Sequence, residues 1–463
     1  MNVSFFSDLL ASISERGRGL IGLGRADEHA RASVADLTRL SHELISRRGE
    51  ASGVALARVI LDRYMSLPQK DRFAYLAHVA AEFGSDEPAI ERAIEAYRQT
   101  PSRTSVSALH HAAEPKSQEL IRRLNLAQGG TLSLVRMRED LIDLAQMLRA
   151  ERSDAAQAID SLDADFVHLF SSWFNRGFLV LRRIDWTTPA NILEKIIRYE
   201  AVHEISDWDD LRRRIAPADR RCFAFFHPAL VDEPLIFVEV ALTTEIPPAI
   251  APILAKQRDP IPLKAATTAV FYSISNCQRG LAGVSFGNFL IKQVVEDLCR
   301  ELPTLRAFVT LSPAPGFAAW LRREIEAEEP TGITREDRDV LRRMDEAGWS
   351  DDPRIAEAVR RALISAGAYY FLRAKTSSGR PLDAVARFHL GNGARLERLN
   401  FLGDTSAKGL KQSHGLMVNY LYDLDTIEKH HEAYANSGTV TASGAVQRAL
   451  KLDGPSRVAA AGE

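Results

Sequence analysis

The spacing of apolar residues changes near Trp173, and this change constrains the fold more than any other feature of the chain. From about Asp27 to Phe174, apolar residues recur three and four positions apart, which is the period of an amphipathic helix. Beyond that point, short runs of β-branched and aromatic residues alternate with helical stretches. The pattern predicts an all-α region followed by an α/β domain in which helices pack on a mixed sheet. A chain of 463 residues suggests more than one domain, and we place the two at 1–172 and 173–463.

The first region is predicted to contain helices only. Their expected ranges are 33–48, 52–65, 70–83, 88–98, 116–126, 134–149 and 162–174. Pro68 and Gly84 follow two of these ranges and suit the ends of helices. The region shows no fixed-period repeat, and its polar surface indicates no chemistry. We therefore expect it to serve packing or oligomerisation.

The second region is predicted to supply the sheet. Its expected strands are 178–184, 222–226, 235–242, 270–274, 306–311, 384–390 and 395–402. Asn392 and Gly393 separate the last two runs, and this dipeptide favours a β-hairpin. From about residue 452 the sequence becomes small and polar, so we expect a disordered tail.

Charge and composition exclude several classes of function. Lys plus Arg number 59 and Asp plus Glu number 61, so the chain lacks the basic surface that nucleic acid or an anionic membrane requires. No run of 18 apolar residues predicts a membrane span. The three cysteines, Cys222, Cys277 and Cys299, form no C-x-x-C motif, which argues against a zinc site or a disulfide framework. These observations favour a cytoplasmic protein without a metal.

A glycine-bearing turn after the fourth expected strand is the first candidate binding site. Gly280, Gly283 and Gly287 interrupt the pattern before helical spacing resumes. Backbone N–H groups at the start of a helix attract anions, and glycine lets a phosphate approach the backbone closely. The segment that begins at Gln278 resembles the phosphate turn of GNAT acyltransferases, Q/R-x-x-G-x-G/A, although Leu281 stands where that pattern has its first glycine.

Four further residues are candidates for chemistry. Ser312 ends the expected strand after the turn and precedes Pro313, so it is either a helix-capping Ser-Pro turn or a hydroxyl held on a stiff loop. His389 lies in an expected strand, where alternation places it on the opposite face from its two neighbours. Tyr420 and Tyr422 would share one face of a strand, which also suits simple packing at a sheet edge.

Taken together, these residues resemble the malonyl-CoA decarboxylase family over more than half of the chain, from Trp173 to Tyr422. The motifs that carry the resemblance are Glu200–His203, Phe271–Ser275, Phe289–Lys292, Leu311–Phe317, Phe388–Ala394 and Gly415–Tyr420. The resemblance implies a helical N-terminal domain, a GNAT-like catalytic domain and a homo-oligomer, either a tetramer or a dimer. It also implies conversion of malonyl-CoA to acetyl-CoA and CO2 without a cofactor, coenzyme A being part of the substrate.

The same resemblance assigns roles to individual residues. It places the catalytic serine and histidine at Ser312 and His389, both in contact with substrate, and a tyrosine of the catalytic hydrogen-bond network at Tyr422. Family convention makes Ser312 the proton acceptor and His389 the proton donor, a division that the residue types alone leave open. The turn that binds coenzyme A falls on Ala282, Gly283, Val284, Ser285, Phe286, Gly287 and Asn288. Some members carry a glutamate where this chain has Ser285, which leaves the role of that position open.

The chemistry of decarboxylation fits these residue types. Loss of CO2 from a malonyl thioester leaves an enolate, so the site must stabilise negative charge on the thioester oxygen and then protonate carbon. His389 suits proton transfer because the ordinary pKa of histidine lies near neutrality. Two alternatives remain open at this point. They are a CoA-dependent acyltransferase with the same fold and a non-catalytic protein that binds acyl-CoA.

Overall fold

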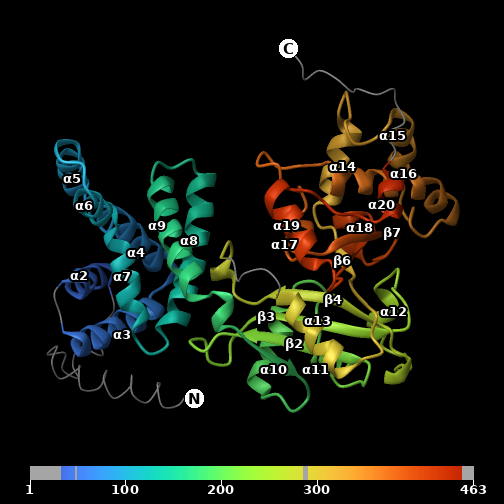
Figure 1. The fold of residues 1–463 in the computed structure, drawn as a ribbon, viewed down its shortest axis with the longest axis horizontal. Coiled ribbons are helices and arrows are strands. Elements are labelled where there is room, and N and C mark those ends of the chain that lie inside the picture. The colour runs from blue at the N-terminus through green and yellow to red at the C-terminus, as the bar shows by residue number, and fades with distance from the viewer. Residues whose placement is uncertain (1–32, 47–48, 285–289, 451–463) are drawn as a thin grey trace. The chain divides into compact units, whose positions relative to one another are not determined.

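The computed structural model describes residues 33–46, 49–284 and 290–450 (Figure 1). The expected disordered tail and Ser285–Asn288 of the predicted CoA turn lie outside these residues. Contacts divide the chain into two compact units. Described residues of the first unit fall within Met1–Val180, Phe226–Leu235 and Gln278–Phe286, and those of the second within Leu181–Phe225, Ile236–Cys277 and Gly287–Glu463. The predicted domain boundary after residue 172 stays a prediction.

The N-terminal part of the first unit is helical, as the apolar spacing predicts (Figure 1). Its helices are α2 (Val34–Ile45), α3 (Glu50–Ser66), α4 (Gln69–Glu82), α5 (Glu87–Gln99), α6 (Arg103–Ala113), α7 (Lys116–Asn125), α8 (Gly130–Ala150) and α9 (Ala156–Trp173). The ranges predicted from the sequence do not include α6, which buries none of its residues. Its local signal is a capping box, in which Ser102 and Ser105 satisfy each other's backbone N–H groups.

The second unit holds almost all of an eight-stranded mixed sheet. The strands are β1 (Val180–Ile184), β2 (Arg220–Phe226), β3 (Pro234–Thr243), β4 (Thr268–Asn276), β5 (Ala307–Thr310), β6 (Ser312–Pro313), β7 (Arg395–Asn400) and β8 (Met417–Leu421). They follow the order β1-β2-β3-β4-β5-β8-β6, with β7 also paired to β8. β4 and β5 are parallel, whereas β8 runs antiparallel to β5, β6 and β7. The predicted fold class, a helical region followed by a mixed-sheet α/β domain, is confirmed.

Helices accompany this sheet throughout the second unit. They are α10 (Ala190–Tyr199), α11 (Trp208–Ile215), α12 (Ala251–Leu254), α13 (Leu290–Glu301), α14 (Phe317–Glu326), α15 (Arg335–Leu341), α16 (Pro353–Leu372), α17 (Ala384–Gly391), α18 (Ala407–Ser413), α19 (Ile427–Ser437) and α20 (Gly444–Ala449). Every residue of β2 is buried, and so is every residue of β3 except Thr243. Strands buried on both faces read as continuous apolar runs, which is why the sequence revealed them clearly.

The prediction of a strand at 384–390 is wrong, because this segment forms α17. Asp383 caps the helix, and its carboxylate accepts a hydrogen bond from the backbone N–H of Ala386 at 2.8 Å. Ala386, His389 and Leu390 are buried, at the i, i+3, i+4 spacing of a helix face. The expected hairpin is therefore also wrong. Its glycine, Gly393, follows the end of the helix with a φ of +82°, which glycine adopts without strain.

Candidate active site

A cavity of about 260 Å³ opens where β4 and β5 part within the second unit. The two strands pair only from Thr268 to Phe271, and the last bond runs from the N–H of Leu311 to the carbonyl of Phe271 at 3.0 Å. The chain then moves to β6 and pairs with β8, while β4 continues to Asn276. Residues of β4, β6 and α17 line the cavity together with Val202.

Ser312 opens β6 and faces this cavity. Its backbone pairs with Val418 of β8, which anchors the start of the Ser-Pro segment. The hydroxyl Oγ donates to Thr310 Oγ1 at 2.9 Å and lies 3.1 Å from His389 Nε2. The Ser-Pro segment is therefore a short strand that presents a hydroxyl, and helix α14 starts only at Phe317.

His389 also lines the cavity, from the buried face of α17. Its ring lies between hydrogen-bonding groups: Nε2 meets Ser312, and Nδ1 lies 2.8 Å from the hydroxyl of Tyr422. The ring stacks on Tyr420 with a centroid distance of 4.6 Å and an interplanar angle of 28°. Burial lowers the pKa of His389 from 6.5 to about 3, so the imidazole is neutral at physiological pH.

Tyr422 directly follows β8 and is almost completely buried. Burial raises the pKa of its hydroxyl well above the ordinary value, so the group is a neutral phenol. Its ring meets Phe271 edge-on at 6.2 Å, and the rings of both Tyr420 and Tyr422 contact His389. The expected common face of these tyrosines is confirmed. The three residues assigned to catalysis thus form one hydrogen-bonded chain, and their roles stay predictions.

Only part of the predicted CoA turn is described, namely Ala282, Gly283 and Val284. Gly283 has a φ of +78°, a left-handed conformation that favours glycine. The described turn residues fall in the first compact unit, whereas Ser312 and His389 fall in the second. The roles of the turn residues in binding stay predictions.

Within the first unit, the side chain of Arg138 on α8 is hydrogen-bonded to the backbone of this turn. Its guanidinium is 3% exposed and donates to the carbonyls of Gly280 and Ala282, both at 2.8 Å. The same side chain forms an ion pair with Asp163 at 2.7 Å. A Cβ at Gly280 would lie 1.9 Å from the carbonyl oxygen of Val135, so only glycine fits against α8. Sequence reasoning missed this role, because the contact joins residues 142 positions apart.

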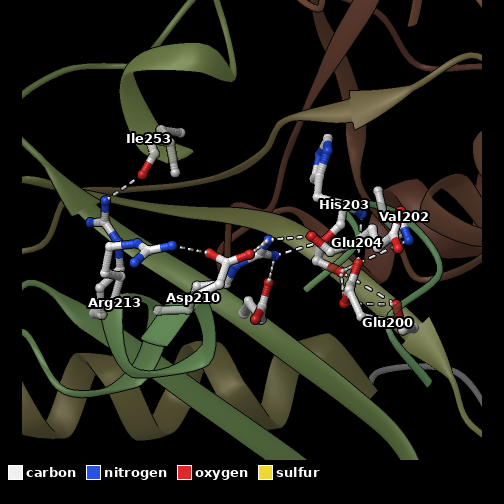
Figure 2. Close-up of polar contacts among 12 residues, drawn as sticks. Glu200, Val202, His203, Glu204, Asp210, Arg213 and Ile253 are labelled. Atoms are coloured by element: carbon white, nitrogen blue, oxygen red, sulfur yellow. Dashed lines mark hydrogen bonds and ion pairs between the residues drawn. The ribbon is translucent and has the colours of Figure 1, made fainter. Parts of the chain in front are cut away.

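The loop from Glu200 to Glu204 forms another wall of the cavity through Val202. Figure 2 shows Glu200 close to the backbone of this loop, with Asp210 and Arg213 farther along the same polar network. The carboxylate of Glu200 accepts hydrogen bonds from the N–H groups of Val202 and His203 at 2.8 and 2.7 Å. It also accepts from the hydroxyls of two serines of β4, Ser273 and Ser275.

Two cations hold the same loop by its carbonyl groups. Arg214 donates to the carbonyls of His203 and Glu204 at 2.7 and 2.8 Å and forms an ion pair with the fully buried Glu239 at 3.2 Å. Burial raises the pKa of Glu239 to about 8. Lys408 donates to the carbonyls of Ala201 and Val202 at 2.8 and 2.9 Å. The Glu200–His203 motif drew attention to this loop in the sequence, but the sequence did not show that Glu200, Arg214 and Lys408 hold the loop in place.

The described residues contain neither a metal-binding cluster nor a membrane-spanning helix. Among the described residues, no group of three or more His, Cys, Asp and Glu side chains is arranged to hold a metal ion. No helix in the described ranges is long and apolar enough to cross a bilayer. Cys222, Cys277 and Cys299 are not joined in disulfides.

Comparisons with known proteins agree on one family. Residues 83–174 match the model of the malonyl-CoA decarboxylase N-terminal domain, and residues 177–460 match that of the C-terminal domain. Mitochondrial malonyl-CoA decarboxylase of Anser anser anser is 34% identical over 400 residues, covering 80% of this chain and 78% of that protein. Its counterpart in Rattus norvegicus is 36% identical over 356 residues, covering 72% and 71%.

Solved structures lead to the same family. Malonyl-CoA decarboxylase from Rhodopseudomonas palustris is 58% identical with a TM-score of 0.86, covering 90% of this chain and 99% of that one. The enzyme of that name from Agrobacterium vitis is 57% identical with a TM-score of 0.83, covering 90% and 100%. With matching models over both of its regions, the chain belongs to the malonyl-CoA decarboxylase family.

Proposed function

We propose that this chain is a carboxy-lyase that converts malonyl-CoA to acetyl-CoA and CO2. The observation that carries the proposal is the buried chain of Tyr422, His389 and Ser312, two members of which line the cavity beside β4. Membership of the family and the names of its relatives support the same reaction. The substrate and product are those of fatty-acid and malonate metabolism.

The reaction needs a negative charge to be held and a proton to be delivered. When the C–CO2 bond breaks, its electron pair moves into the thioester as an enolate, and a proton then reaches the α-carbon to give acetyl-CoA. One preorganised hydrogen-bond donor at the enolate oxygen is worth about 3 kcal/mol. Of the polar groups that line the cavity, we assign donation to that oxygen or delivery of the proton to His389, and relay of the proton to Ser312.

The state of His389 shapes this chemistry. Because the imidazole is neutral, it acts as a neutral N–H donor and not as a resting imidazolium. The apolar side chains of Phe271, Ile274 and Val385 also line the cavity. A carboxylate is poorly solvated among such groups, whereas CO2 is uncharged, so this lining favours loss of the carboxylate.

Binding of the nucleotide part of the substrate is assigned to the turn from Ala282 to Asn288. Support comes from the glycine conformation at Gly283 and from the match of the segment to a phosphate turn in sequence.

The decisive experiment is incubation of the purified protein with malonyl-CoA alone. We expect release of CO2 and formation of acetyl-CoA in equal amounts, followed by mass spectrometry. Turnover without an acceptor excludes the acyltransferase alternative, and binding of CoA without turnover would favour the non-catalytic one.

Variants of the site test the assigned residues. Ser312→Ala and His389→Ala are each expected to lower kcat by about 10²–10⁴-fold, the usual contribution of a positioned acid or base. Ser413→Ala is a matched control, because Ser413 is a buried serine that bonds the carbonyl of Gly409 and does not line the cavity. Wild-type turnover in both site variants would show that the assignment is wrong.

The proposal extends to cofactor, assembly and location. The chain is proposed to need no metal or prosthetic group, because hydrogen-bond donors alone can stabilise the enolate, and activity should survive dialysis against EDTA. It is proposed to form a homo-oligomer, a tetramer or dimer, as the resemblance to the family implies, and light scattering would measure the mass. A cytoplasmic location is proposed because the three cysteines are not joined in disulfides.

A further inference from the structure

Thr310 is the second hydrogen-bond partner of the Ser312 hydroxyl, besides His389, and the proposed reaction gives it no part. It ends β5 and is completely buried. Its Oγ1 accepts two hydrogen bonds, from Ser312 Oγ at 2.9 Å and from the backbone N–H of Tyr420 at 3.1 Å. Its carbonyl accepts a third, from Asn419 Nδ2 at 2.7 Å. Two of these bonds come from β8, so Thr310 is fixed in place independently of Ser312.

The direction of the bond between Ser312 and Thr310 determines the rest of the chain. A serine hydroxyl carries one proton, and Ser312 donates it to Thr310. The contact of 3.1 Å with His389 then requires that Nε2 is the donor and Ser312 the acceptor. A neutral imidazole carries one ring proton, so Nδ1 must accept the proton of Tyr422. The donors therefore run from Tyr422 through His389 and Ser312 to Thr310.

We propose that Thr310 is a positioning residue, which fixes the direction of this hydrogen-bond chain and holds the ring proton of His389 on Nε2. Nε2 is the ring nitrogen that contacts Ser312, and both residues line the cavity. Reversing the chain would place the ring proton on Nδ1, toward Tyr422, and leave a lone pair at Nε2. The neutral imidazole would then lose its N–H donor on the side of Ser312. The effect on rate rests on the proposed decarboxylase function, whereas the tautomer does not.

The first test measures the tautomer in the full-length wild-type chain. Protein labelled with ¹⁵N-histidine is examined by long-range ¹H–¹⁵N NMR, and the signal of His389 is assigned by its loss in His389→Gln. We expect a neutral ring protonated at Nε2. A ring protonated at Nδ1 in the wild type overturns the proposal, whatever the variants show.

The second test removes the hydroxyl of Thr310 while keeping the side-chain shape. In Thr310→Val we expect the His389 signal to move toward the Nδ1–H form and kcat to fall about 10²-fold, the cost of a misplaced reacting group. KM should change by less than about threefold, because substrate contacts remain. Thr310→Ser restores the acceptor and should recover both the tautomer and most of the rate.

The outcomes separate this proposal from the proposed function. A folded Thr310→Val protein with the wild-type tautomer and wild-type kcat contradicts the role of Thr310. If that variant does not fold, the wild-type tautomer and the Thr310→Ser variant still decide. A wild-type chain that releases no CO2 from malonyl-CoA contradicts the proposed function but leaves the tautomer measurement intact.

Discussion

His389 is kept uncharged by its surroundings, and this has a consequence for activity. Burial places its pKa at about 3, and among the described residues no carboxylate is bonded to the ring to favour the imidazolium. We therefore expect kcat to show no acid limb near pH 6.5, the ordinary pKa of histidine. Steady-state kinetics between pH 5 and 8 would measure this. If kcat falls at low pH but no longer does so in a variant of another histidine, the expectation stands. A fall in kcat caused by protonation of His389 itself would contradict it.

The same shift predicts how stability depends on pH. The pKa in the folded chain lies below that of the unfolded chain, so the unfolded state binds the proton first as pH falls. The contribution of neutral His389 to stability is complete above pH 6.5 and declines as pH falls from 6.5 toward 3. Urea unfolding at pH 7.0 and 4.5 should show a smaller loss of stability in His389→Gln than in wild type. Equal losses would contradict the assignment.

Tyr422 offers a substitution that removes a single group. In Tyr422→Phe the ring contact with Phe271 is kept, and only the hydroxyl bonded to His389 is lost. We expect the free energy of unfolding to fall by about 1 kcal/mol and kcat to fall about tenfold, the equivalent of one hydrogen bond. Kinetics and urea unfolding measure the two effects separately. A tenfold change in KM with constant kcat would instead indicate a role in binding.

At the scale of elements, the carboxylate of Glu200 is one of the groups that hold the Glu200–Glu204 loop in place. Glu200→Ala would leave two backbone N–H groups and two serine hydroxyls without their acceptor. We expect a loss of about 1–3 kcal/mol in stability for each buried group left unsatisfied, less where water enters. The displacement of Val202 should also lower kcat/KM about tenfold or more, because the cavity changes shape.

A matched control for the loop is Glu194→Ala. Glu194 lies on the neighbouring α10, and its side chain is 62% exposed. Substitution of an exposed residue away from special features changes stability by about 0.5 kcal/mol or less. If both variants behave alike in unfolding and kinetics, Glu200 does not support the wall.

The second element-scale prediction concerns α8 and the turn that it holds. Arg138→Gln removes a guanidinium that bridges two carbonyls and Asp163. If the turn binds coenzyme A, the dissociation constant for CoA should rise about tenfold or more, with kcat little changed, because the lost order affects binding and not chemistry. Arg136→Gln is the control, since Arg136 is 54% exposed on the same helix. Calorimetric titration with CoA measures the effect, and equal affinities in both variants would contradict it.

At the scale of the whole molecule, the sequence predicted what local patterns determine. The three-and-four spacing located most helices of the first region, and the buried runs of β2, β3 and β4 identified the central sheet. The prediction of a strand at 384–390 was wrong, because seven mostly apolar residues fit the period of a helix as well as that of a strand. The feature that distinguishes the two is the helix cap at Asp383. Ser312 was correctly placed after a strand.

Contacts between residues far apart in the sequence could not be predicted from local patterns. The contact between Ser312 and His389 spans 77 positions, and that between His389 and Tyr422 spans 33. The resemblance to the family identified Ser312, His389 and Tyr422 as candidates. Neither the periodicity nor the spacing of the sequence indicates that His389, on a helix, contacts Ser312, at the start of a strand. The direction of the hydrogen bonds, and hence the part of Thr310, depends on atomic positions that no sequence pattern encodes.

The division into compact units yields a prediction for the whole chain. The matched family models part between residues 174 and 177, but Phe226–Leu235 and Gln278–Phe286 group with the helical unit by contacts. A fragment of residues 177–463 would therefore lack the residues that hold Gly280 and Ala282. We expect this fragment to lose binding of CoA in calorimetry, even if circular dichroism shows a folded sheet. Wild-type affinity in the fragment would contradict this view.

The bond between Arg138 and the turn also affects how natural variants of this chain are interpreted. A substitution in the helical region would ordinarily be classed as a defect of folding or assembly. Arg138 and Val135 of α8 lie against the turn. If the turn binds coenzyme A as proposed, changes at these two positions would instead appear as weak binding of substrate in a protein of normal abundance. Genetic screens that score abundance alone would classify such alleles as harmless, and only assays at limiting substrate would reveal them.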